Sequence, residues 1–138
     1  MIQLPEQKEK ISGLTKGTFS FAYRLNEAAV GKTIYGLLSL SNSNADREYG
    51  ALYIKPKDNR IGYEVQGKGD KYITVRNGNS VNNAEWHTVT YAFDGTQAEF
   101  YLDGVSIGKF ATTHLLKGDW TPDMVTLGGI SRTITISG

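Results

Sequence analysis

Short segments in which apolar and polar residues alternate are the feature that most constrains this chain. Between Thr18 and Leu25, the aromatic residues Phe19, Phe21 and Tyr23 fall on one side of an extended chain, and smaller or polar residues fall on the other. This period of two is typical of a strand with one buried face. Further segments of strand length span 34–41, 49–55, 60–66, 71–76, 86–93, 97–103, 105–110, 123–128 and 132–136. The alternation therefore predicts about ten strands.

The connections between these segments carry turn residues. Glycine, asparagine and aspartate gather at 67–70, 76–80 and 93–96, and the pair Asp103-Gly104 is a strong signal for a two-residue hairpin. Only 111–119 is suited to a short helical turn. Many short strands with tight turns predict an all-β fold, an antiparallel β-sandwich. A chain of 138 residues is expected to form one domain, 1–138, around a single core.

Composition excludes several classes of protein. Fifteen basic and fourteen acidic side chains give a net charge of +1, which is too balanced for a surface that binds nucleic acid non-specifically. With no cysteine there is no disulfide and no cysteine-ligated zinc. No apolar run is long enough for a membrane helix, so no membrane partner is expected. Residues 1–11 lack the apolar stretch of a secretion signal, and we expect them to be a lead-in that is either poorly ordered or appended to the natural chain, with a signal peptide left out.

The sequence contains no recognisable catalytic motif. His87 lies inside a strand and His114 in an irregular segment, and neither has a nucleophile and an orienting group at a recognisable spacing. The acidic residues Asp94, Glu99 and Asp103 flank tight turns, where aspartate is commonly a turn residue. No metal or phosphate motif is present, so no cofactor and no metal are expected. We therefore do not expect an enzyme.

Some polar and aromatic residues suit a binding face. Glu64 shares one face of its strand with Gly62 and Gln66, where it is either a solvated carboxylate or a ligand contact. Arg132 begins the last predicted strand, and its guanidinium suits a bidentate contact with a carboxylate. Tyr53 is either a core residue or a ring that packs against a sugar. Other arginines that offer a cation are Arg24, Arg60 and Arg76.

The sequence also resembles a known family. The segment WHTVTYAFDGTQAEFYLDGVSIGK is similar to a pair of strands shared by concanavalin A-like and laminin-G-like sandwiches. The order of GTFSFAYRL, LLSLSNSNADREYGALYIK, IGYEVQ and LGGISR resembles the sialic-acid-binding carbohydrate-binding module of family 40, a lectin-like domain attached to bacterial sialidases. The resemblance covers about 12–138. It implies a concanavalin A-like jelly roll that binds sialylated glycans without a metal.

The resemblance also implies a set of ligand-binding residues. Arg132 would hold the carboxylate of sialic acid, and Glu64 would accept hydrogen bonds from an amide or hydroxyl of the sugar. Backbone groups of Ser39, Leu40 and Ser41, together with the side chain of Leu40, would border the N-acetyl group. Tyr53 would supply the aromatic surface.

Two residues depart from the family. Gln66, which we also expect among the ligand-binding residues, stands where the family often has a second arginine, and the tyrosine expected after Arg132 is missing. A second cation would then come from Arg24 or Arg76. The chain also looks short for the family, with an abbreviated opening strand and no closing strand. We therefore expect either a trimmed chain or self-association in which a partner strand completes an open sheet edge.

The sequence thus predicts a secreted or cell-surface binding module that recognises terminal sialic acid and tethers an exo-α-sialidase to its substrate. A laminin-G-like protein-interaction or adhesin domain is the alternative. A glycan hydrolase in its own right is the least favoured hypothesis, because the chain is too short for the residues that sialidase chemistry needs.

Overall fold

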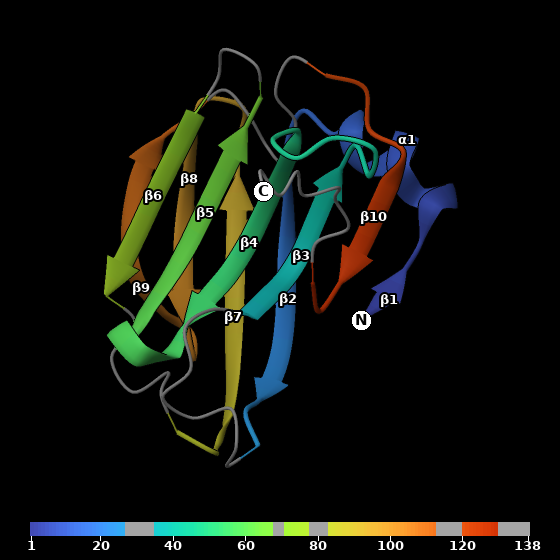
Figure 1. Ribbon diagram of the computed structural model, residues 1–138. Coiled ribbons are helices and arrows are strands. Elements are labelled where there is room, and N and C mark those ends of the chain that lie inside the picture. Colours follow the sequence, from blue (N-terminus) through green and yellow to red (C-terminus); the bar gives the residue numbers. More distant parts are fainter. Residues whose placement is uncertain (27–34, 68–70, 78–82, 113–119, 130–138) are drawn as a thin grey trace.

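The chain folds into two antiparallel sheets that pack face to face (Figure 1). The computed structural model describes residues 1–26, 35–67, 71–77, 83–112 and 120–129. The elements in chain order are β1 (Ile2–Gln3), η1 (Pro5–Gln7), α1 (Lys8–Ser12), β2 (Gly17–Arg24), β3 (Tyr35–Ser41), β4 (Tyr49–Lys55), η2 (Pro56–Asp58), β5 (Arg60–Gln66), β6 (Lys71–Asn77), β7 (Trp86–Phe93), β8 (Gln97–Leu102), β9 (Val105–Ala111) and β10 (Met124–Leu127). One sheet has the order β1-β10-β3-β4-β5-β6 and the other β2-β7-β8-β9. The predicted antiparallel sandwich is confirmed.

The strands lie where the alternation placed them. Every strand predicted between 18 and 128 is present, with its bounds shifted by one residue at most. The predicted strand at 132–136 lies outside the described residues. Of the predicted helical turn at 111–119, only Ala111 and Thr112 are described, and Ala111 is the last residue of β9.

The N-terminal segment corrects one expectation. Instead of a poorly ordered lead-in, residues 1–11 form β1, η1 and most of α1. Ile2 of β1 pairs with Leu127 of β10, and Leu4 and Ile11 pack against the core. Elements of two to five residues are too short to show a periodic pattern, which is why the sequence did not reveal them. No helix within the described residues is long and apolar enough to cross a membrane.

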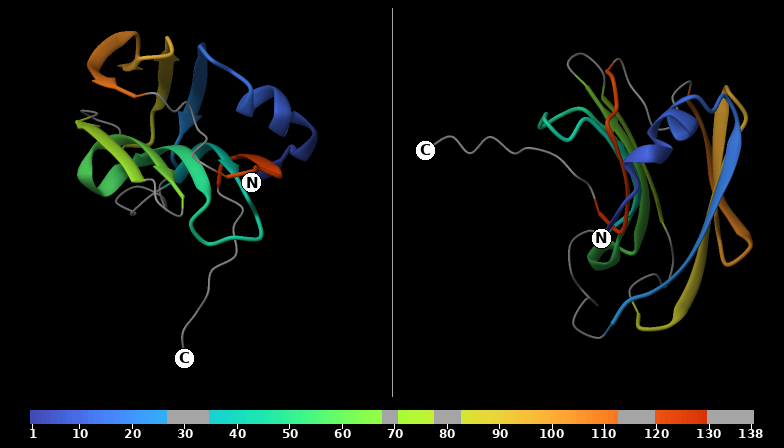
Figure 2. Two further views of the ribbon diagram at one scale, coloured as in Figure 1. Left: turned by 90° about the horizontal axis from the view of Figure 1, so that it is seen from above. Right: turned by 90° about the vertical axis from the view of Figure 1, so that its right-hand side faces the viewer.

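The two sheets face each other (Figure 2), and the core side chains lie between them. Its largest side chains form an aromatic group that joins the sheets. Tyr63 of β5 stacks on Tyr91 of β7 with ring centroids 5.6 Å apart, and Phe100 of β8 lies 5.3 Å from Tyr91. Phe110 of β9 contacts all three rings. Because these side chains face inward, their neighbours in β5 face away from the second sheet.

The hairpin between β8 and β9 confirms the turn that its sequence predicts. Asp103 and Gly104 both have positive φ, 51° and 82°, which is the backbone of a type I′ turn. Within the described residues, β2 and β9 are the edge strands of the four-stranded sheet. Self-association through such edges stays a prediction.

Candidate functional site

The outer face of the six-stranded sheet carries most of the candidate residues. We use the term outer face for the side of this sheet that is turned away from the four-stranded sheet, which is the side toward the viewer in Figure 1. Inward-facing residues of β4 and β5, such as Leu52 and Tyr63, belong to the core cluster. Their neighbours along each strand point outward because successive side chains alternate. The outer face thus brings together Tyr49, Ala51 and Tyr53 of β4 with Gly62, Glu64 and Gln66 of β5.

Glu64 is held by its two neighbours on this face. The hydroxyl of Tyr49 donates a hydrogen bond to Glu64 Oε1 at 2.9 Å. The Nε2 amide of Gln66 donates to the same oxygen. Both hydrogen bonds go to Oε1, so within the described residues the carboxylate is oriented from one side.

Tyr53 lies flat against the sheet because Gly62 leaves room for it. The two residues are direct partners across β4 and β5. A Cβ at position 62 would lie 2.1 Å from Cζ of the Tyr53 ring, so only glycine is compatible with this ring position. Burial, and secondarily the charge of Glu64, raises the pKa of Tyr53 to about 12. The hydroxyl therefore keeps its proton at neutral pH and can donate.

The chain returns to this face immediately after β10. Ser39 Oγ donates a hydrogen bond to the carbonyl oxygen of Gly129 at 2.8 Å. Ser39 lies between the core residues Leu38 and Leu40, so its side chain points outward, and Gly129 therefore lies over the outer face. Arg132, the expected carboxylate clamp, follows three residues later and lies outside the described residues.

The structure places Leu40 and Ser41 on opposite faces of β3. Leu40 is fully buried in the core between the sheets, so its side chain is not on the face that holds Glu64. The expectation that this side chain borders a ligand is corrected, because the pleat allows only alternate residues on one face. Ser41 points outward, and its buried hydroxyl has no hydrogen-bond partner within the described residues.

The arginines that the sequence suggested as alternative cations lie on different strands. Arg60 lies on the outer face at the start of β5, four residues from Glu64. Arg24 ends β2 in the other sheet, and its guanidinium carbon lies 5.6 Å from the centre of the Trp86 ring. The side chain of Arg76 lies outside the described residues. Among the described arginines that the sequence suggested, Arg60 alone shares a face with Glu64.

Sequence reasoning missed Tyr49. In the segment YGALYIK both faces of β4 are buried, so apolar residues follow one another and the alternation is lost. Its only signal in the sequence is its place four residues before Tyr53, which puts both tyrosines on one face of a strand. The partnership of Tyr49 with Glu64 depends on the register between β4 and β5, which the sequence does not show.

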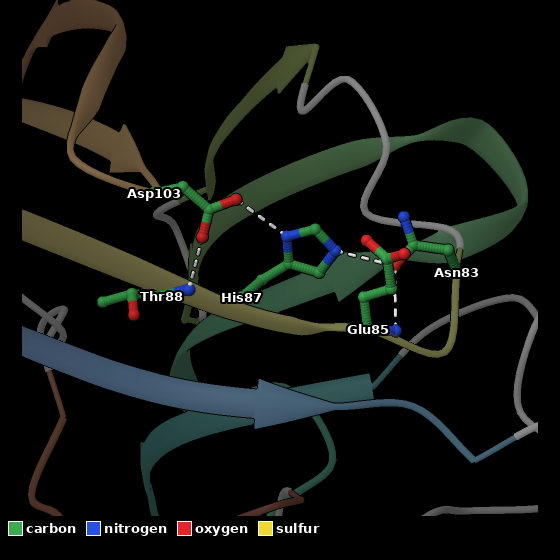
Figure 3. Close-up of polar contacts among 5 residues, drawn as sticks. All are labelled: Asn83, Glu85, His87, Thr88 and Asp103. Carbon is green, nitrogen blue, oxygen red and sulfur yellow. Dashed lines mark hydrogen bonds and ion pairs between the residues drawn. The ribbon is translucent and has the colours of Figure 1, made fainter.

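His87 belongs to a separate polar cluster (Figure 3). Its Nδ1 lies 2.8 Å from Asp103 Oδ2, and its Nε2 lies 2.7 Å from Asn83 Oδ1. Asp103 also accepts the backbone N–H of Thr88, and Asn83 accepts that of Glu85. The ring is only 7% exposed and both of its nitrogens are occupied, so it ties the start of β7 to the β8–β9 hairpin. His87 is thus placed as a structural residue, whereas His114 lies outside the described residues.

We expect Asp103→Asn to destabilise the fold and to change its pH dependence. The hydrogen bond from His87 and then that from the Thr88 N–H lower the pKa of Asp103. A carboxyl with a lowered pKa stabilises the fold above its unfolded value of about 3.9, and this contribution is lost as the pH falls through the folded pKa. Asparagine tolerates the positive φ, so the turn itself is kept.

The expected loss at pH 7 is about 1 kcal/mol in the free energy of unfolding, measured by urea denaturation. The difference between wild type and Asp103→Asn should shrink as the pH falls below about 4. A difference that stays constant from pH 7 to pH 3 would contradict the lowered pKa of the Asp103 carboxyl and the hydrogen bonds that cause it.

Comparisons with known proteins agree with this architecture. Residues 2–133 match the family model described as the concanavalin A-like lectin/glucanases superfamily. No curated protein matches the chain.

Solved structures show the same fold. The CBM40 of the Ruminococcus gnavus IT-sialidase bound to α2,3-sialyllactose is 24% identical, with a TM-score of 0.71 over 85% of this chain and 65% of that one. Its complex with α2,6-sialyllactose gives 24% identity and a TM-score of 0.69 over 85% of this chain and 66% of that one. Domains LG4-5 of the mouse laminin α1 chain are 18% identical, with a TM-score of 0.55 over 81% of this chain and 27% of theirs. The chain thus spans just under two thirds of the length of the CBM40 structures.

These similarities support the resemblance to family 40 modules at the level of the fold. The family model covers nearly the whole chain, from β1 to beyond β10. The chain belongs to the concanavalin A-like lectin/glucanases superfamily.

Proposed function

We propose that this chain is a non-catalytic carbohydrate-binding module that recognises terminal sialic acid on its outer face. The observation that carries the proposal is the grouping of Tyr49, Tyr53, Glu64 and Gln66 beside the point where Gly129 returns to this face. The fold similarity to modules solved with sialyllactose supports it.

The chemistry of this face suits an anionic acetylated sugar. Glu64 supplies a fixed acceptor for an amide N–H or a hydroxyl, and Tyr53 supplies a donor on a ring that is held against the sheet. The ligand carboxylate needs a cation, and we assign this role to Arg132 because it follows Gly129 so closely. Gln66, which stands in place of a second arginine, donates to Glu64 instead and leaves the site with less positive charge.

We further propose that the module belongs to a secreted or cell-surface protein and keeps an attached exo-α-sialidase near its substrate. A weak site is sufficient for this purpose because a tether raises the local concentration of the glycan at the catalytic domain. A site with a single charged clamp is expected to have a Kd of about 10⁻⁴ to 10⁻³ M.

NMR titration tests the proposed ligand. The ¹H–¹⁵N spectrum should change on addition of α2,3- or α2,6-sialyllactose and should not change with lactose. Arg132→Ala and Glu64→Gln should each weaken binding by about tenfold or more, the factor expected for a lost charge-assisted contact. Arg60→Ala, on the same face, should leave the affinity unchanged.

Other outcomes would count against parts of the proposal. Loss of binding in Arg60→Ala but not in Arg132→Ala would assign the role of the cation to Arg60 of β5. No spectral change with either sialyllactose would remove sialic acid as the ligand. Binding to a desialylated glycoprotein that Arg132→Ala leaves intact would favour a protein-interaction domain instead.

A further inference from the structure

The loop between β3 and β4 forms a rim at one end of the outer face. Residues 42–48 make up this loop, which projects away from the four-stranded sheet in the right-hand view of Figure 2. Tyr49, which follows the loop, pairs with Gln66 of β5, and both side chains donate to Glu64. The loop therefore borders the end of the face that holds Tyr49, Gln66 and Glu64.

A hollow lies between this loop and the end of β5. It is lined by residues 45–48 and by Gly67, which directly follows Gln66, and we call it the rim hollow. Its volume is about 300 Å³, which is at the lower limit for small-molecule sites. Residues in a strand are about 3.3 Å apart, so Gly67 lies roughly 10 Å from Glu64. Two linked sugar rings can span this distance.

Hydrogen bonds fasten the loop at its base and to the segment before β10. The N–H of Asn42 donates to the carbonyl oxygen of Glu48 at 2.8 Å, and its Nδ2 amide donates to Glu48 Oε2 at 2.7 Å. The carboxylate of Asp123 accepts the backbone N–H of Ser43 at 2.7 Å and the Ser43 hydroxyl at 2.6 Å. A loop that is already held in place loses little conformational entropy when it contacts a ligand.

Arg47 is the cation that this loop carries. Its side chain is exposed, and within the described residues no hydrogen bond or ion pair occupies its guanidinium. A guanidinium donates to two neighbouring oxygens at once, and the carboxylates of Asp46 and Glu48 accept from hydroxyls. One guanidinium and two carboxylates give the rim hollow a net charge of −1, which disfavours another anionic group. The rim hollow therefore suits a neutral group with adjacent hydroxyls better than it suits the carboxylate of sialic acid.

We propose that the rim hollow is a subsite for the neutral sugar that carries the terminal sialic acid, with Arg47 as its main contact. This inference rests on the proposed function, because it places a second sugar of the same glycan next to the one at Glu64. It goes beyond that function because it makes the module specific for sialylated chains over sialic acid alone.

NMR titration of Arg47→Ala with two kinds of ligand tests the subsite. The α2,3- and α2,6-sialyllactoses carry a neutral sugar next to sialic acid, whereas the methyl α-glycoside of sialic acid carries only a methyl group there. Arg47→Ala should bind at least one sialyllactose about tenfold more weakly than wild type, the effect of losing a charge-assisted hydrogen bond. Its affinity for the methyl glycoside should be unchanged. A contact of this size is too weak to hold lactose by itself.

Two further variants make the test specific. Arg47→Lys keeps the charge but not the paired donors, so it should recover only part of the affinity for sialyllactose. Arg60→Ala is the matched control, because Arg60 is an exposed arginine at the opposite end of β5 and its removal should change neither affinity.

The two proposals fail in different ways. If Arg47→Ala binds both sialyllactoses as wild type does, or weakens the methyl glycoside to the same extent, the subsite is wrong while the proposed function stands. If wild type binds neither the sialyllactoses nor the methyl glycoside, both proposals are wrong. Because the Arg47 side chain is exposed, Arg47→Ala should unfold at the same urea concentration as wild type, which checks that any loss of binding is local.

Discussion

Gly62→Val is expected to lower the free energy of unfolding by roughly 1–3 kcal/mol and to weaken binding of sialyllactose by about tenfold or more. The reason is steric. The new Cβ would lie 2.1–2.4 Å from Cζ, Cε2 and the hydroxyl oxygen of Tyr53, a residue that is only 4% exposed. The ring must leave its place against β5 and would no longer lie beside Glu64. Urea denaturation and NMR titration measure the two effects.

Two further variants make this prediction specific. Gly17→Val, at the start of β2, is the control because a Cβ there meets only an ordinary contact of 3.8 Å with Leu14. In a Tyr53→Ala background the Gly62→Val change should cost little, since the ring that it displaces is absent. Unchanged stability and affinity in Gly62→Val would show that Tyr53 does not lie over Gly62.

Phe100→Ala is expected to cause the largest loss of stability, about 3–5 kcal/mol in the free energy of unfolding. Phe100 is fully buried and its ring contacts those of Tyr91 and Phe110. Removing it leaves a cavity where the two sheets meet. Since small domains are stabilised by only about 5–15 kcal/mol, this loss is a large part of the total.

Urea denaturation of Phe100→Ala tests this prediction, with Val105→Ala as the control. Val105 begins β9 and is 67% exposed, so its truncation should change the free energy of unfolding by about 0.5 kcal/mol or less. A loss below about 1 kcal/mol in Phe100→Ala would mean that the aromatic group does not hold the sheets together.

The placement of residues on the outer face could be predicted only in part from the sequence. Glu64 and Gln66 could be placed on one face because they lie two residues apart in a strand, and the structure confirms that placement. Tyr53 remained either a core residue or a binding residue, and the structure shows it buried on the outer face. Leu40 was assigned through a family resemblance, although the alternation along β3 turns its side chain to the core. When a site residue is inferred from a family resemblance, the face of the strand on which its side chain lies should therefore be checked.

By itself, the sequence determined the strands of four or more residues, the turn between β8 and β9 and the sandwich, because alternation of side chains and positive-φ residues such as Asp103 and Gly104 are local properties of the chain. Only the tertiary structure decided that Tyr49 bonds Glu64 and that Ser39 bonds Gly129. These contacts join residues 15 and 90 positions apart. They depend on strand order and register, which arise from the packing of the whole sandwich and leave no local signal in the sequence.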